Sequence, residues 1–306
     1  MRGRSPGYLE LLESAELLRR AQALEARLEK CDLCPRKCGV DRRSSPSGYC
    51  GGGALPKVAS INLHHWEEPP ISGSGGSGTI FFSGCTLRCI FCQNYPISQM
   101  GVGRQIGIEE LACGMLELQN KGAHNINLVS STHQLPAVVR ALLRAAQKGL
   151  RIPLVHNCGG YESVETLRLL DQVIDIYLPD IKYSDPRSAG KYSGASDYVA
   201  HNREALCEMW RQTGPLEIDD AGIAVRGMMV RHLVLPENLA GSAEAFSFLA
   251  QRLGPRVWVS LMNQYFPAHK GLSTPPLDRK TTEEEYEAAF AAMTEAGIVN
   301  GYVQEC

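Results

Sequence analysis

The chain has 306 residues, of which 44% are hydrophobic and 21% are charged. This composition is typical of a globular protein with a sizeable core and excludes a disordered or collagen-like chain. The net charge of −2 gives no reason to expect nucleic acid or an anionic membrane as partner. No stretch approaches the roughly 18 apolar residues of a membrane-spanning helix, and we expect a cytoplasmic location. The eleven cysteines, in a chain too long to need disulfides, suggest metal binding.

The first predicted element is one amphipathic helix of about 20 residues. Apolar residues recur at helical spacing from Leu9 to Leu28 amid Glu and Arg, which is the pattern of a helix with one buried face. The helix ends at a group of four cysteines, Cys31, Cys34, Cys38 and Cys50. Four thiolates close a tetrahedral metal site completely, and closed sites are usually structural. The spacing fits both Zn²⁺ and an iron–sulfur cluster.

A glycine-rich stretch, Ile71–Gly78, follows, and its composition alone is that of a flexible linker. It runs directly into Thr79–Gly84, an apolar run of strand length. Glycines before a strand and a cofactor loop are also expected where the backbone approaches a ligand closely. We favour an ordered turn for this stretch.

The strand leads into a second group of cysteines, Cys85, Cys89 and Cys92, in a C-x3-C-x2-C spacing. Three thiolates this close hold three irons of a [4Fe-4S] cluster and leave the fourth iron open to substrate. Because the chain then already carries cluster chemistry, we favour an iron–sulfur cluster over zinc at the first group as well. Cys113 and Cys207 are expected in helix cores and Cys306 at a frayed end.

From here apolar, β-rich runs alternate with helical patterns. The predicted strands after the first are Ile126–Ser130, Ile152–Asn157, Val173–Pro179, Met228–Leu235 and Val257–Met262. The predicted helices are 108–121, 135–148, 162–171, 198–212, 242–253 and 282–296. Six βα units predict an α/β fold with a parallel sheet, closed only as a partial or open barrel. We divide the chain into an N-terminal helix with a cysteine-rich metal knuckle (1–72) and the barrel (73–306). Ligand-binding residues are expected beyond the carboxyl ends of the strands.

Several motifs together resemble those of a known family. They are His64–Gly73, Ser83–Asn94 with its three cysteines, Asn127–His133, Tyr177–Lys182, Val230–Pro236 and Met262–His269. The chain is similar in them to the radical S-adenosylmethionine (SAM) superfamily. The more specific resemblance is to the pyruvate formate-lyase activating enzyme group, in its branch with an N-terminal four-cysteine segment. The fold implied is a partial (β/α)6 radical SAM barrel.

The resemblance also implies a mechanism and its cofactors. A [4Fe-4S] cluster on Cys85, Cys89 and Cys92 would reductively cleave bound SAM and give a 5′-deoxyadenosyl radical, which abstracts hydrogen from a substrate. The second metal site, [4Fe-4S] or Zn, would lie at the N-terminal cysteines. A reducing electron donor such as flavodoxin or ferredoxin is the expected partner, and a protein is one candidate substrate. Neither membrane nor nucleic acid is expected.

The resemblance assigns cofactor-binding roles to residues near strand ends. Phe91 would lie against the adenine, with a loop anchor over the cluster as the alternative. Ser130 and Thr132 stand where the activating enzymes carry Gly-Gly-Glu to bind the SAM amino group, so either would offer an oxygen acceptor. A helix N-cap is the alternative role of Thr132. Asn157 is a candidate for the SAM ribose or carboxylate.

Asp180 and Lys182 match the Asp-x-Lys of the activating enzymes. Two residues apart on a strand, they point to the same side. Lys182 would neutralise the SAM carboxylate with Asp180 holding it, and a salt bridge without a ligand is the alternative. His269 sits where related activases place a Tyr-His pair near the ribose.

Arg231 and His232 would face a substrate carboxylate or amide, although His232 is equally well explained as a core histidine. Cys158 is a candidate to donate or receive a hydrogen atom, against a small residue fitting beneath the cofactor. Three functions stay open: a radical SAM enzyme of unknown substrate, an activase that installs a glycyl radical on a partner enzyme, and a non-enzymatic metal-binding scaffold.

Overall fold

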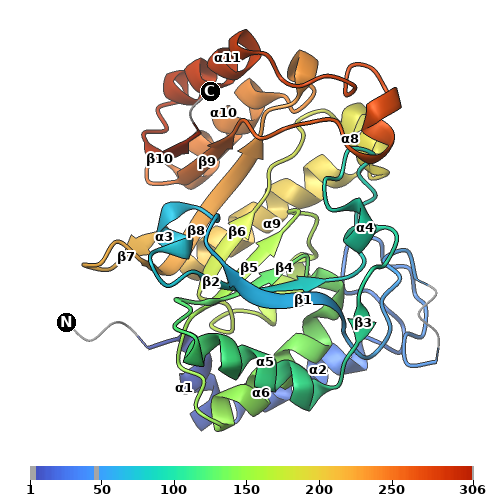
Figure 1. Ribbon diagram of the computed structural model, residues 1–306, viewed down its shortest axis with the longest axis vertical. Helices are drawn as coiled ribbons and strands as arrows, with labels where there is room; N and C mark the ends of the chain where they lie inside the picture. The colour runs from blue at the N-terminus through green and yellow to red at the C-terminus, as the bar shows by residue number, and fades with distance from the viewer. Residues whose placement is uncertain (1–4, 45–47, 305–306) are drawn as a thin grey trace.

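The computed structural model describes residues 5–44 and 48–304 (Figure 1). Its helices are α1 (Gly7–Glu13), α2 (Glu16–Ala26), α3 (Pro69–Ser72), α4 (Tyr95–Ser98), α5 (Ile108–Asn120), α6 (Leu135–Gln147), α7 (Val164–Arg168), α8 (Pro186–Ser193), α9 (Tyr198–Thr213), α10 (Ser242–Leu253) and α11 (Glu283–Glu295). Its strands are β1 (Lys57–His64), β2 (Ser77–Phe82), β3 (Arg104–Gln105), β4 (Ile126–Val129), β5 (Leu154–Cys158), β6 (Ile176–Pro179), β7 (Glu217–Ile218), β8 (Ala224–Leu233), β9 (Trp258–Met262) and β10 (Asn300–Val303). Short 3-10 turns form η1 (Thr132–Gln134), η2 (Pro236–Asn238) and η3 (His269–Ser273).

The strands form one curved sheet in the order β10-β9-β8-β6-β5-β4-β2-β1-β3, with β7 beside β8. From β2 to β10 the neighbours are parallel and follow chain order without reversal. Adding each strand on the same side winds the sheet into a barrel with its helices outside. The predicted α/β fold with a partial barrel of βα units is confirmed.

Two edges of the sheet differ from the prediction. β10 adds a seventh parallel strand beside β9; its short sequence, Asn300-Gly-Tyr-Val303, carries too little alternation to indicate a strand. At the other edge β1 runs antiparallel to β2, with His64 opposite Ser77, and β3 pairs with β1. A strand that precedes residue 72 thus lies in the same sheet as the barrel strands.

The helices differ from the prediction in several places. The single N-terminal helix is two helices, because Ala15 adopts a left-handed conformation (φ 61°) before α2. The apolar stripe explains the break: Tyr8 and Leu11 are buried in α1, but no large apolar residue stands at positions 14 and 15 to continue it. The predicted helix 162–171 is shorter in the structure, where it is α7, and the glycine-containing α8 was not predicted. The side chain of Cys113 on α5 is exposed, although it was expected in the core. Cys306 lies outside the described residues.

The glycine-rich stretch is an ordered turn between α3 and β2, as expected. Gly73 (φ 47°) follows α3 and Gly76 (φ 84°) precedes β2. A β-carbon on Gly75 would meet the carbonyl oxygen of Gly122 at 2.4 Å. The glycines therefore permit a tight reversal against a neighbouring loop.

Alternate strand residues face the barrel interior and the surrounding helices. On β5, Val155 packs in a small interior core with Ile71 of α3, whereas Leu154 and Cys158 belong to the large core beneath the helices. Asn157 therefore faces the interior. This alternation decides which polar strand residues meet inside the barrel.

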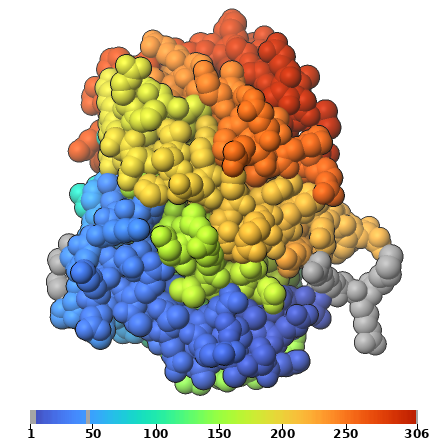
Figure 2. Space-filling view, turned by 180° about the vertical axis from the view of Figure 1, so that it is seen from behind, coloured from blue at the N-terminus to red at the C-terminus, as the bar shows by residue number. Residues whose placement is uncertain are grey.

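The N-terminal segment covers the back of the barrel, where it lies against residues 150–170 (Figure 2). Arg27 donates to the Thr166 hydroxyl at 2.9 Å, and that hydroxyl donates to the Leu33 carbonyl at 2.8 Å. Among the described residues, no helix is long and apolar enough to cross a membrane.

Candidate functional site

The cysteine loop leaves the carboxyl end of β2 through Gly84. Gly84 has φ 89°, and a β-carbon there would lie 2.3 Å from the carbonyl oxygen of Cys50, so the loop turns directly against the N-terminal segment. Burial lowers the pKa of His133 to about 4, and the neutral ring lies 2.8 Å from the Ser83 carbonyl through Nε2. Glycine conformation and a buried histidine thus fix where the loop begins.

Each sulfur of the loop has a polar neighbour. The Leu87 amide donates to Cys85 Sγ at 3.4 Å, the Ser193 hydroxyl donates to Cys89 Sγ at 2.9 Å, and the Ser98 hydroxyl lies 3.2 Å from Cys92 Sγ. Burial raises the pKa of the Cys85 thiol to about 12 and also raises that of Cys89. Buried thiolates therefore need a positive partner, and iron ions bound to the three sulfurs would supply it.

The seven cysteines do not form a compact ligand set for one ion. Within residues 5–44 and 48–304, one set of three or more potential ligands has all its ligand atoms within 4.8 Å of one another, and it contains none of these seven cysteines.

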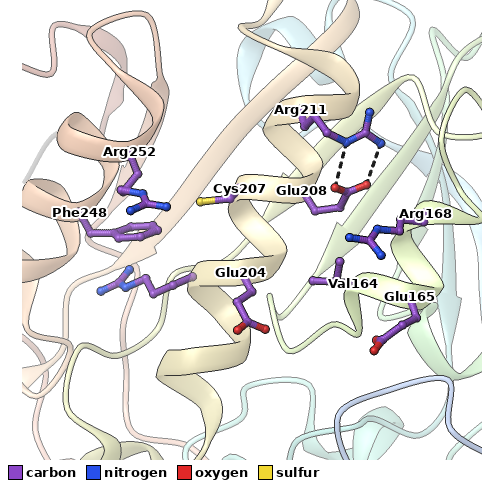
Figure 3. A pocket seen from close by; sticks show the side chains of 10 residues that line it. Val164, Glu165, Arg168, Glu204, Cys207, Glu208, Arg211, Phe248 and Arg252 are labelled. Carbon is purple, nitrogen blue, oxygen red and sulfur yellow. Dashed lines mark hydrogen bonds and ion pairs between the residues drawn. The ribbon is translucent and has the colours of Figure 1, made fainter.

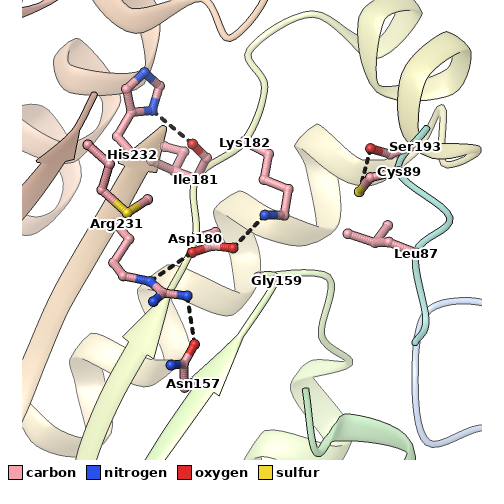
Figure 4. A network of polar contacts seen from close by, with 12 residues as sticks. Leu87, Cys89, Asn157, Gly159, Asp180, Ile181, Lys182, Ser193, Arg231 and His232 are labelled. Atoms are coloured by element: carbon pink, nitrogen blue, oxygen red, sulfur yellow. Dashed lines mark hydrogen bonds and ion pairs between the residues drawn. The ribbon is translucent and has the colours of Figure 1, made fainter. Parts of the chain in front are cut away.

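A charged network fills the interior beside the loop (Figure 4). Asp180, just beyond β6, accepts from Lys182 and, at 3.0 Å, from Nε of Arg231 on β8. Arg231 Nη2 donates to the Asn157 side-chain oxygen at 2.7 Å. Burial alone would raise the pKa of Asp180, but the two cations lower it, so the carboxyl stays ionised.

The two cations of the network stay charged for the same reason. Although burial opposes the charge, Asp180 raises the pKa of both Lys182 and Arg231. Lys182 in turn favours the ionised form of Cys89, which places its charge next to the cysteine loop. The network therefore holds a fixed cation between Asp180 and the candidate cluster.

Three further polar residues face the interior and had no predicted role. Glu67 and Glu68 lead into α3, and Glu67 Oε2 lies 3.7 Å from Arg231 Nη1. Burial raises the pKa of Glu67, with Arg231 opposing it. One oxygen of Glu68 and the amide of Asn127 are buried without a hydrogen bond of ordinary geometry in the described structure. The sequence signals for this set were the motifs His64–Gly73 and Asn127–His133, which contain these residues but assign them no role.

Phe91 and His269 each pack against an aromatic residue where the cysteine loop and the segment after β9 lie together. Phe91 is 6% exposed and packs edge-on against Tyr265 with ring centroids 6.0 Å apart. His269 (φ 52°) stacks on Tyr95 at 4.7 Å. The Gly271 amide donates to the Ile90 carbonyl at 2.8 Å, so the segment after β9 closes over the loop.

Other predicted residues are placed differently from the expectation. The Thr132 hydroxyl donates to Glu162 at 2.6 Å and caps no helix. His232 points away from the interior: its ring nitrogens lie 2.8 Å from the Ile181 carbonyl and 2.9 Å from the Ser242 hydroxyl, and its ring packs on Phe246.

Two residues next to Asn157, Cys158 and Ser130, lie differently relative to the charged network. Cys158 follows Asn157 on β5 and therefore faces the helices rather than the network. Ser130, at the end of β4, takes a left-handed conformation (φ 55°), and its amide donates to the Asn157 carbonyl at 2.9 Å. Ser130 thus stays next to the network, whereas Cys158 does not reach it.

The four N-terminal cysteines line one small enclosed cavity together with Thr86 and His133. Arg42, 2% exposed, anchors this segment by donating to the carbonyls of Gly52 and Gly53 at 2.8 and 2.7 Å. Arg36 Nε donates to the Thr86 carbonyl at 3.0 Å. Because Thr86 adjoins Cys85, the two cysteine groups lie on adjoining loops.

A larger hollow lies on the outside, between α7, α9 and α10 (Figure 3). Arg211 there pairs with Glu208 at 2.8 Å, and Arg203, whose pKa burial lowers to about 10, lies over the Phe248 ring at 4.3 Å. The residues that line it include none from the charged network or the cysteine loop. Size alone therefore does not mark the functional site.

Comparison with known proteins shows what the loop and network resemble. Residues 79–215, which include the three loop cysteines, Asn157, Asp180 and Lys182, match the sequence model of the Radical SAM superfamily. This part of the chain is therefore similar to a superfamily whose domain implies a [4Fe-4S] cluster and SAM.

The chain is also similar to other proteins. An uncharacterized protein of Methanocaldococcus jannaschii is 29% identical over 269 residues, which is 86% of this chain and 73% of that protein. The structure described as native anSMEcpe with bound AdoMet is similar with a TM-score of 0.47 and 9% identity over 72% of this chain. That of HydG, a maturase of the [FeFe]-hydrogenase, has a TM-score of 0.45 and 13% identity over 70% of this chain. The matches span 61% and 47% of those two chains.

Proposed function

We propose that the protein is a radical SAM enzyme whose [4Fe-4S] cluster is bound by Cys85, Cys89 and Cys92. The observation that carries this proposal is the position of Lys182, whose charge lies between the Asp180 carboxylate and the Cys89 sulfur. A cluster with an open iron, once bound, supplies the electron that cleaves SAM reductively and yields a radical for hydrogen abstraction.

The residues around the loop have distinct roles in this proposal. Lys182, held by Asp180, neutralises the SAM carboxylate. Asn157, fixed by Arg231, presents its amide to the same end of the cofactor. Ser130 lies next to Asn157, to whose carbonyl its amide donates. Phe91 offers an aromatic face to the adenine, and His269, held against Tyr95, binds near the ribose.

Arg231 has a different role from the one expected from the sequence. It already contacts Asp180, Asn157 and Glu67, so we assign it to positioning rather than to the substrate. Among the buried atoms without a hydrogen-bond partner are two acceptors on neighbouring elements, Glu68 Oε2 and the Asn127 amide oxygen. Acceptors buried without partners favour a ligand that brings N–H or O–H donors.

The N-terminal cysteines belong to the proposal as a second, closed site. Four cysteines line one cavity, and an iron–sulfur cluster is favoured over zinc because the adjoining loop would already carry cluster chemistry. A flavodoxin or ferredoxin as electron donor and a cytoplasmic location complete the proposal. That the substrate is a glycine of a partner enzyme rests on the sequence resemblance alone and stays the second candidate.

The decisive experiment is SAM cleavage. The protein is reconstituted anaerobically with iron and sulfide, reduced with dithionite and mixed with SAM, and 5′-deoxyadenosine and methionine are quantified. We expect both products from the wild type, none from Cys89→Ala, and wild-type amounts from the matched control Cys113→Ala, which removes an exposed cysteine of α5. Absence of cleavage by wild-type protein with a verified cluster would contradict the enzyme and leave the scaffold function.

The second site is tested by metal analysis. A Cys85/Cys89/Cys92 triple alanine variant is reconstituted, and iron, sulfide and zinc are counted. Iron and sulfide in near-equal amounts would support the N-terminal cluster, whereas zinc with four sulfur ligands would contradict it. For the activase, the absence of any glycyl-radical enzyme from the organism's genome would end that candidate.

A further inference from the structure

A second group of metal-ligand side chains lies on the opposite face of β5 from the charged network. His156 and Cys158 alternate with the inward-facing Asn157, and Glu162 follows in the loop after the strand. All three are buried, with exposures of 0%, 2% and 1%. The proposed SAM site uses none of them.

The three ligand atoms converge on one point. The Nε2 or Nδ1 atom of His156, the Cys158 sulfur and a Glu162 oxygen all lie within 4.8 Å of one another. His156 Nε2 and Glu162 Oε2 are 3.8 Å apart. Neither of these two atoms has a hydrogen-bond partner in the described structure. Buried polar atoms are almost always partnered, so two such atoms facing each other call for an explanation.

The other atoms of the same side chains are held by hydroxyl groups. Ser131 Oγ lies 3.1 Å from His156 Nδ1, and the Thr132 hydroxyl donates to Glu162 Oε1 at 2.6 Å. A histidine that binds a metal through one nitrogen commonly donates from the other, and ligating carboxylates are hydrogen-bonded in turn. Ser131 and Thr132 thus orient Nε2 and Oε2 toward the shared point.

We propose that His156, Cys158 and Glu162 form a binding site for one transition-metal ion, best suited to Zn²⁺. Imidazole, thiolate and carboxylate are the ligands that zinc binds, and three protein ligands leave the fourth tetrahedral position to water. Nitrogen and oxygen at about 2.1 Å from a tetrahedral ion are about 3.4 Å apart. The observed 3.8 Å needs only a small contraction.

A bound ion would join two segments that border the proposed SAM site. His156 and Cys158 lie on either side of Asn157, and Glu162 ends the turn that begins at Gly159, whose carbonyl accepts from Tyr198 at 2.9 Å. Through the Ser131 and Thr132 hydroxyl groups, which contact His156 and Glu162, the ion would also be connected to η1 and to the residue before it. The ion would therefore hold in place the strand end that carries Asn157.

The test measures zinc directly on the full chain with its clusters reconstituted. The protein is incubated anaerobically with Zn²⁺, freed of excess ion, analysed for zinc by mass spectrometry and examined by zinc K-edge X-ray absorption. We expect about one Zn²⁺ per chain with a single sulfur ligand and nitrogen or oxygen otherwise. Zinc at the N-terminal cysteines would instead show four sulfurs. Zinc binding absent, or confined to four-sulfur coordination, would overturn the proposal.

Variants separate this site from the others. Glu162→Gln keeps an acceptor for the Thr132 hydroxyl but replaces Oε2 by an amide nitrogen, and Cys158→Ser removes the sulfur; both should lose the mixed-ligand zinc. Thr132→Val, which removes only the supporting hydrogen bond, should weaken zinc binding about 10-fold in chelator competition. Cys113→Ser is the matched control and should bind zinc as the wild type does.

Mixed-ligand zinc that persists in both Glu162→Gln and Cys158→Ser would also overturn the proposal. The wild-type absorption spectrum remains decisive if a variant fails to fold.

Discussion

The hydroxyl of Ser193 should set the reduction potential of the proposed cluster. Ser193 is the last residue of α8 and is fully buried. Its hydroxyl donates to Cys89 Sγ at 2.9 Å and lies 2.8 Å from the Tyr183 hydroxyl. Because the single Ser193 proton points to sulfur, Tyr183 is the donor to Ser193. Burial raises the pKa of Tyr183, which keeps the phenol protonated.

The size of the effect follows from the strength of one hydrogen bond. Hydrogen bonds to the sulfurs stabilise the more negative, reduced cluster and so raise its potential. A net contribution of about 0.5–1.5 kcal/mol corresponds to about 20–60 mV for a one-electron couple, since 1.4 kcal/mol is about 60 mV per electron. Ser193→Ala should lower the potential by that amount.

The assay is a redox titration of reconstituted protein followed by electron paramagnetic resonance, using the signal that disappears in Cys89→Ala. Ser188→Ala is the control, because Ser188 lies on the same helix and its hydroxyl donates to Asp185 at 3.2 Å instead of to a sulfur. A potential that is unchanged or higher in Ser193→Ala, or an equal shift in Ser188→Ala, would refute the reasoning.

Three further predictions concern stability and are measured by urea denaturation. Arg231→Lys keeps the charge but leaves the Asn157 oxygen without its donor, so unfolding should require about 1–3 kcal/mol less; an unchanged midpoint would contradict this. Thr282→Ala removes the capping box that begins α11 and should cost about 1 kcal/mol, whereas a neutral result would show that the cap contributes nothing. Arg279 lowers the pKa of Glu285 to about 2, against about 4.3 unfolded, so this pair stabilises the fold above about pH 4 and the benefit is lost as the pH falls toward 2. Arg279→Gln should therefore be less stable than the wild type at pH 6 but not at pH 2, and a difference that persists at pH 2 would argue against this linkage.

The sequence predicted the fold wherever periodicity was strong. The strand before the cysteine loop and the helices α5, α6, α9, α10 and α11 all lie within a residue or two of their predicted bounds. The weak signals failed for physical reasons. β10 is a four-residue strand that contains a glycine, and Ala15 breaks the first helix through a backbone conformation that alanine rarely adopts.

The alternation of side chains along a strand predicted those parts of the candidate site that lie at strand ends. Asp180 and Lys182, two residues apart, point to the same side and form the expected pair. The prediction of one shared role for the adjacent residues Arg231 and His232 was the weak point, because neighbours on a strand cannot both line one cavity. Arg231 faces the interior, whereas His232 faces Phe246 of α10. Glu67 precedes a one-turn helix and shows no periodic signal, so only the structure reveals its ion pair with Arg231.

The contact between Cys50 and Gly84 has a consequence for how the protein is made. The four N-terminal cysteines leave the ribosome before the three of the loop, and Arg36 with the Cys50 carbonyl forms the surface on which that loop rests. An N-terminal segment that lacked the metal proposed for it would leave the later loop without this support. Loss of that metal should then also weaken the binding of the cluster proposed for the loop.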